Sequence, residues 1–219
     1  MEASQGGAAA SRDAPAPAQP QTYVTAPITA SGTALGLAGF ALSTFLLSMY
    51  NAHLVSTAGE PVIFPMLLLY GGIAQFIGGM WEFRTGNTFA AVTFGSYGAF
   101  WAGLWLLLTH YLKMVPAGGV ANHALGLFLW SWALFTTMLF IASLRSNLAV
   151  VVTVALLVIV EIILAIGYDS GSLNTVKVGG YVGIALAAVA WYTMFSIILE
   201  STFGRPVLPV ISLEHLFVR

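Results

Sequence analysis

The sequence predicts an all-α, polytopic membrane protein with six transmembrane helices and both termini in the cytoplasm. Of its 219 residues, 58% are hydrophobic and 7% are charged, whereas soluble domains carry roughly 25% charged residues. The mean hydropathy is +0.89. So few charges leave most of the surface to face lipid. The apolar residues also gather in six runs, each near the ~20 residues that span a bilayer as a helix.

The chain divides into a tail, six spans and a second tail. Residues 1–33 are rich in Ala, Pro, Gln, Ser and Gly, a composition that buries too little apolar surface to fold alone, so we expect a disordered tail. The transmembrane domain is predicted over residues 34–200. Its apolar runs are Leu35–Val55, Val62–Trp81, Phe89–Leu112, Ala124–Leu144, Leu148–Tyr168 and Val178–Leu199. Residues 201–219 hold Gly and two Pro and are expected to form a cytoplasmic tail.

Local signals support these boundaries and set the orientation. Asn87 and Asn147 stand where the third and fifth helices need N-caps. The basic residues divide five to two between the two sides, as Arg12, Arg84, Arg145, Arg205 and Arg219 against Lys113 and Lys177. Since the side richer in Lys and Arg faces the cytoplasm, both termini are predicted to be cytoplasmic.

A few polar residues interrupt the spans. Glu161 lies near the middle of the fifth helix, where a carboxylate costs several kcal/mol unless it is neutralised, paired or hydrated. It either handles a proton beside a substrate path or bonds a neighbouring helix in its neutral form, and the sequence favours the second role. Gln75 and Asn51 could line a polar path or bind another helix. Glu82 and Arg84 are expected to form a solvated pair at the membrane surface.

Composition and motifs exclude several classes of function. The chain has no cysteine and a net charge of −1, so it offers no thiolate chemistry and no basic footprint for nucleic acid. The sequence contains no HExxH, GxGxxG or Walker motif. We therefore expect neither an enzyme nor a bound cofactor or metal, and interpret the chain as a path for a small solute or a passive structure.

Four stretches resemble the acetate uptake transporter family, which includes bacterial succinate–acetate permeases and related fungal acetate transporters. They are Tyr70–Gln75 (YGGIAQ), Gly86–Phe89 (GNTF), Phe94–Trp101 (FGSYGAFW) and Phe203–Pro209 (FGRPVLP). The likeness covers roughly residues 35–210. Family members usually open the first helix with NPAPLGL, but here Ser31–Leu37 reads SGTALGL. Only Leu35, Gly36 and Leu37 keep that motif, so altered affinity, substrate range or gating is expected.

The resemblance implies a homohexamer in the plasma membrane, in which each protomer has its own pathway. It implies a narrow apolar constriction formed by Phe40, Tyr97 and Leu157, with Ala190 near the same site. An apolar neck desolvates a carboxylate at high cost and a methyl group at none, so acetate or succinate is expected to cross with a proton. Outside the neck, hydrogen bonds are expected from Gln75, Asn51, Ser96 and the Tyr97 hydroxyl.

Two other readings remain open from the sequence. An uncharged narrow lumen would equally serve neutral small solutes such as urea or ammonia. A membrane signalling or scaffolding protein is the third reading, for which the N-terminal tail is the only supporting feature.

Overall fold

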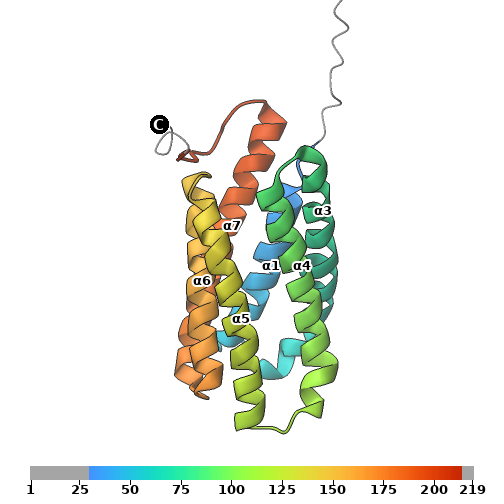
Figure 1. Ribbon diagram of the computed structural model, residues 1–219, viewed down its shortest axis with the longest axis vertical. Coiled ribbons are helices and arrows are strands. Elements are labelled where there is room, and N and C mark those ends of the chain that lie inside the picture. Colours follow the sequence, from blue (N-terminus) through green and yellow to red (C-terminus); the bar gives the residue numbers. More distant parts are fainter. Residues whose placement is uncertain (1–29, 214–219) are drawn as a thin grey trace, which may run out of the picture.

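The computed structural model describes residues 30–213, and these form an antiparallel bundle of six membrane-spanning segments (Figure 1). The first span is α1 (Thr33–Asn51). The second joins the 3₁₀ turn η1 (Thr57–Ile63), α2 (Phe64–Met66), the π-helix η2 (Leu67–Ala74) and α3 (Gln75–Thr85). The third joins α4 (Thr88–Leu106), η3 (Leu107–Tyr111) and η4 (Leu112–Met114). The last three are α5 (Gly119–Ser143), α6 (Leu148–Asp169) and α7 (Leu173–Phe203).

The predicted all-α fold with six spans is confirmed. Within residues 30–213 the only β feature is an isolated bridge between Asn147 and Ser212. Both predicted asparagine caps are present, because the Asn87 side chain accepts from the Ala90 N–H at 3.1 Å and that of Asn147 accepts from the Val150 N–H at 3.0 Å. Each satisfies an amide that the first helical turn leaves free.

The spans pack closely where glycine faces a neighbouring backbone. The most extensive pairings are α1 with α7, α5 with α6, α6 with α7, and α3 with α4. Gly180 of α7 lies against the backbone of Ala52, and a Cβ at this position would overlap the Ala52 nitrogen. Such close approach is the usual role of small residues in membrane helices.

Only the inner ends of the two predicted tails lie among the described residues. Residues 1–29 and 214–219 of those tails lie outside the described residues. The Ala30 carbonyl accepts from the Trp81 indole N–H at 2.8 Å, and α7 continues to Phe203. Both ends of the described chain lie at the same end of the bundle (Figure 1), as an even number of spans requires.

Candidate functional site

Two cavities enter the bundle from opposite ends and meet at three side chains. One cavity, of about 90 Å³, runs from Asn51 and Glu60 inward. The other, of about 190 Å³, runs from Asn87 and Asn147 inward. Among the described residues, those that line both cavities are Phe40, Tyr97 and Leu157. The bundle therefore has a neck where α1, α4 and α6 approach one another, and we call these three residues the neck.

The neck residues are buried and closely packed. Tyr97 is 1% exposed, Phe40 5% and Leu157 9%. The Phe40 and Tyr97 rings meet edge to face, with centroids 5.9 Å apart and an interplanar angle of 78°. The Phe100 and Trp132 rings lie against the Tyr97 ring, with centroids 5.7 and 5.4 Å away. Aromatic contacts on several sides hold the tyrosine in one position.

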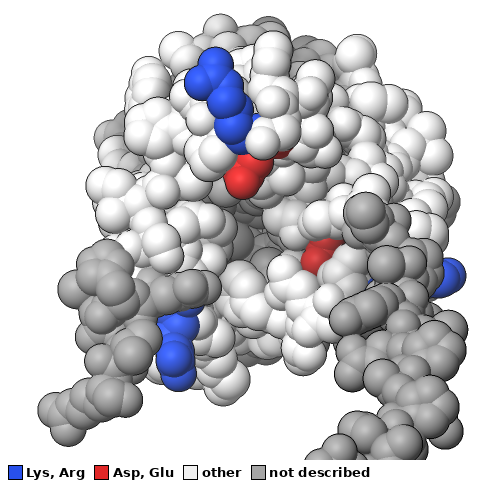
Figure 2. All heavy atoms as spheres, turned by 90° about the horizontal axis from the view of Figure 1, so that it is seen from above, with Lys and Arg blue, Asp and Glu red and all other residues white. Residues whose placement is uncertain are grey.

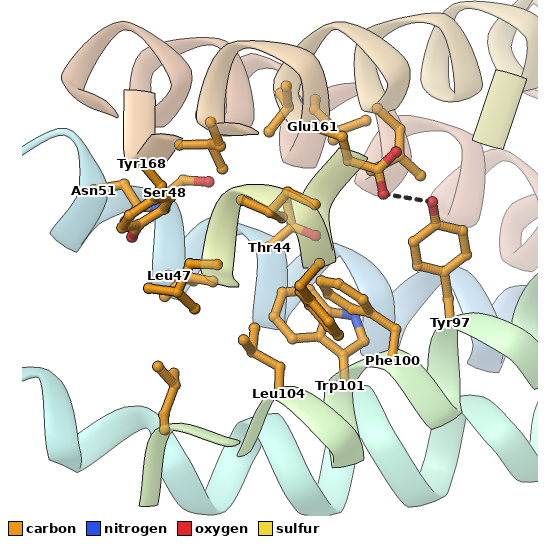
Figure 3. Close-up of a pocket in the computed structure, with 18 of the residues that line it drawn as sticks. Thr44, Leu47, Ser48, Asn51, Tyr97, Phe100, Trp101, Leu104, Glu161 and Tyr168 are labelled. Carbon is orange, nitrogen blue, oxygen red and sulfur yellow. Dashed lines mark hydrogen bonds between the residues drawn. The ribbon is translucent and has the colours of Figure 1, made fainter. Parts of the chain in front are cut away.

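Glu161 lies beside the neck. It follows Leu157 by one helical turn, so the two side chains share a face of α6. The Tyr97 hydroxyl donates to Glu161 Oε1 at 2.8 Å (Figure 3) and also contacts the Thr136 hydroxyl of α5. Glu161 is 3% exposed, and its Oε2 atom has no hydrogen-bond partner among the described residues. The carboxyl thus bonds a neighbouring helix, and its partner is a neck residue.

One face of α1 supplies polar groups to the first cavity. Thr44, Ser48 and Asn51 line this cavity (Figure 3). Phe40, on the same helix, lines it too. Their spacing of three or four residues places them on one side of the helix. The Tyr168 hydroxyl of α6 lies 3.4 Å from Asn51 Oδ1. Sequence reasoning found Asn51 but missed Thr44 and Ser48, although the helical spacing from Phe40 was a usable signal.

The second cavity opens between helix N-termini. Figure 2 looks onto this end of the bundle and shows a hollow at the centre of the face. Leu37 and Gln75 line the cavity, and Asn87 and Asn147 border it where α4 and α6 begin. Gln75 is 1% exposed and its Oε1 has no partner among the described residues. Amide oxygens, helix N-termini and the hydroxyls of Thr93 and Thr153 therefore stand among the apolar side chains of this cavity.

Four residues selected from the sequence lie elsewhere. Ser96 lines a separate shallow groove with Ser131, Trp132 and Phe135. Ala190 is fully buried in the core and lines neither cavity. Leu35 is 41% exposed on the outside of α1. Gly36 packs beneath the Phe94 ring, where a Cβ would overlap it. Gly36 thus lets α1 pack closely on α4, and neither Leu35 nor Gly36 lines the two cavities.

The expected solvated pair of Glu82 and Arg84 is wrong. Glu82 is 1% exposed, and its Oε1 accepts from the Ser31 hydroxyl at 2.6 Å and from the Thr33 N–H at 2.7 Å. The Arg84 guanidinium instead lies 5.2 Å from the centre of the Trp81 ring. The carboxylate is buried because it caps the first turn of α1 and so replaces water with hydrogen bonds.

Comparison with known proteins agrees with this architecture. Residues 16–215 match the model of the GPR1/FUN34/yaaH family. The succinate-acetate/proton symporter SatP of Escherichia coli (strain K12) is 33% identical over 180 residues, covering 80% of this chain and 92% of SatP. The ammonia transport outward protein 2 of Saccharomyces cerevisiae is 32% identical over 166 residues, covering 74% of this chain and 59% of that protein.

A solved structure is also similar. The structure of the bacterial acetate channel SatP superposes with a TM-score of 0.76 and is 34% identical. The superposition covers 83% of this chain and 98% of the SatP chain. The likeness therefore extends over the whole six-span bundle.

Proposed function

Because the chain belongs to the GPR1/FUN34/yaaH family, we propose that it carries acetate and related small carboxylates, succinate included, across the plasma membrane. The observation that carries this proposal is the pair of cavities that enter from opposite ends and share only Phe40, Tyr97 and Leu157 among the described residues. Such an arrangement is a path with one constriction. The names of the relatives, a succinate-acetate/proton symporter and an acetate channel, support the class of solute.

The chemistry of the neck favours a solute that crosses without net charge. Of the three neck side chains, only Tyr97 carries a polar atom, and none of the residues lining the two cavities is Lys or Arg. A bare carboxylate would therefore lose its hydration with no fixed counter-charge, while its methyl group would lose nothing. We infer that the solute passes as the acid or with a proton, which makes the transport proton-coupled.

The second cavity has features that attract a carboxylate before it reaches the neck. The N-termini of α4 and α6 border this cavity at Asn87 and Asn147. Helix N-termini carry partial positive charge and bind anions. At the opposite end, the hydroxyls of Thr44 and Ser48 offer hydrogen bonds to either form of the solute.

Uptake by proteoliposomes tests the proposal. Labelled acetate is supplied outside, with and without a lower external pH, and the flux into protein-free liposomes is subtracted. We expect net uptake that the proton gradient accelerates and that unlabelled succinate inhibits. Uptake no greater than in protein-free liposomes would contradict carboxylate passage. Net uptake that the proton gradient leaves unchanged would contradict the proton coupling but not the passage of carboxylates.

Ammonia is the second candidate solute, since a yeast relative is named for its outward transport. A neutral molecule would also pass a neck without charged side chains. The same liposomes distinguish the two solutes. Ammonium chloride outside, with a pH dye inside, should produce the same alkalinisation with and without protein if the path serves carboxylates. Faster alkalinisation with the protein, together with no acetate uptake, would favour ammonia.

We further propose that six copies assemble, each with its own path. Large apolar side chains face outward along the spans, among them Leu127, Leu134 and Ile141 of α5 at 63–69% exposure, and these suit either lipid or a neighbouring copy. The mass of the complex in a mild detergent tests the assembly. Six chain masses are expected, and a monomer that still transports acetate would contradict the hexamer without affecting the path.

A further inference from the structure

Glu161 is a buried ionisable group beside the proposed path that has no role in the passage of solute described above. Its carboxyl borders the first cavity beside Tyr97, at the end nearest the neck (Figure 3). Oε1 is engaged by the Tyr97 hydroxyl at 2.8 Å. Oε2 is buried and has no partner within the described part of the chain. The residue that lines the wall next to Tyr97 therefore keeps one carboxyl oxygen without a protein partner among residues 30–213.

The hydrogen-bond network around Glu161 accommodates both protonation states. The Thr136 hydroxyl lies 2.8 Å from the Trp132 carbonyl, to which it can donate. If Glu161 is ionised, the Tyr97 hydroxyl donates to it, and the Thr136 hydroxyl can then turn to donate to Tyr97. If Glu161 is protonated on Oε2, the Tyr97 hydroxyl still donates to Oε1, and the O–H at Oε2 has no partner among the described residues. Each hydroxyl has one hydrogen to give, and the two arrangements differ only in the positions of hydrogen atoms.

We propose that Glu161 gives its proton to a carboxylate entering from the first cavity, an inference that rests on the proposed function. The O–H bond of the Glu161 carboxyl breaks and an O–H bond forms on the solute, so Glu161 becomes a carboxylate and acetate becomes acetic acid. The neutral acid then passes the neck. A proton from water in the first cavity restores Glu161, and for solute arriving from the other side the transfer runs in reverse.

Few other groups on this cavity wall can exchange protons. Tyr97 of α4, Tyr168 of α6 and Glu60 of η1 are the other titratable residues that line it. The wall residues from α1, α5 and α7 carry no ionisable side chain. Glu60 and Tyr168 also line the outer pocket with Asn51, so they stand at the mouth. Glu161 is the carboxyl that contacts the neck.

Isotope exchange at equal pH on both sides tests this role. Labelled acetate exchange is measured from pH 5.5 to 8 at fixed total acetate, for the wild type, Glu161→Gln and Glu161→Asp, with protein-free flux subtracted. Well above the pKa of acetic acid, the free acid falls tenfold for each pH unit. For Glu161→Gln, we expect the exchange rate to fall about tenfold for each pH unit over the whole pH range. The wild-type rate should fall less steeply, because Glu161 protonates the abundant carboxylate, and Glu161→Asp should keep this shallower profile.

The shape of the profile separates a proton donor from a structural group. A structural Glu161 would change the rate of the Gln variant by one factor at every pH. Parallel profiles for the wild type and Glu161→Gln would thus overturn the proposal, as would a wild-type rate that falls tenfold per unit throughout. Glu200→Gln, an exposed carboxyl at the end of α7, is the matched control and should follow the wild type. Absence of any wild-type exchange would instead contradict the proposed function.

Discussion

A single carboxylate at the end of α3 holds the start of α1. Glu82 accepts hydrogen bonds from the Ser31 hydroxyl and from the Thr33 N–H and hydroxyl. Ser31 and Thr33 belong to the stretch that departs from the family motif. The departure therefore supplies two hydroxyls to a buried acceptor that also binds the Thr33 backbone N–H, and the first helix is anchored to the second span.

Removal of this acceptor should loosen α1. Glu82→Ala leaves the Ser31 and Thr33 donors without a partner, which we expect to cost about 2 kcal/mol of stability, as for a lost N-cap. The midpoint of thermal unfolding in detergent measures the effect. Arg84→Ala removes a neighbouring exposed charge and should change the midpoint much less. Equal midpoints for the wild type and Glu82→Ala would contradict the capping role.

Leu157 is expected to set the diameter of the neck. Leu157→Ala removes most of a side chain at the point where the two cavities meet, so bulkier carboxylates should enter more readily. We expect the ratio of succinate to acetate uptake to rise by about tenfold, a usual effect of a small change in an apolar site. Ile159→Ala, on the exposed side of the same helix, is the control. An unchanged ratio would place the constriction elsewhere.

At the residue scale, the sequence predicted which side chains matter better than it predicted which residues they contact. The neck residues came from a resemblance in short motifs, and the structure brings them together. That Glu161 bonds Tyr97 was not predictable, because the two are 64 positions apart and one sequence does not give the register between helices. Glu82 was misassigned for the same reason, since its partners are about fifty positions away.

At the element scale, the contact of α1 with α7 depends on glycine. Gly180→Ala would place a Cβ on the backbone of Ala52, and overpacking of this kind costs about 1–3 kcal/mol. Gly119→Ala is the matched control, because a Cβ there meets nothing within 4 Å. We expect a lower midpoint of thermal unfolding for Gly180→Ala only. Similar midpoints for both variants would contradict the close approach of α1 and α7.

The spans themselves were predictable, because hydropathy over about 20 residues is a strong signal. Their ends were less so. The last helix begins at Leu173, before the polar residues Asn174 and Lys177, since Ser172 caps its first turn and its side chain accepts from the Thr175 N–H at 3.3 Å. The π-helical segments Leu67–Ala74 and Leu107–Tyr111 were not predicted from the sequence.

For the whole molecule, the distribution of basic residues predicts the orientation in the membrane. Arg84 lies in the last turn of α3, and Arg145 and Arg205 follow α5 and α7. The C-terminal ends of these three helices lie at one end of the bundle (Figure 1). We therefore expect this end to be cytoplasmic. A reporter fused after Arg219 should give a cytoplasmic signal, and one inserted beside Lys113 an external one. An external signal after Arg219 with a cytoplasmic one beside Lys113 would mean the opposite orientation. Two signals from the same side would contradict the six-span topology.

The central claim is that acetate passes through the neck formed by Phe40, Tyr97 and Leu157. Acetate uptake by proteoliposomes containing Leu157→Trp tests it most directly, because an indole at that position fills the junction of the two cavities. Ile159→Trp adds the same bulk on the exposed side of α6 and controls for the substitution itself. We expect uptake close to that of protein-free liposomes for Leu157→Trp and near the wild type for Ile159→Trp. Wild-type uptake by a folded Leu157→Trp protein would contradict the account.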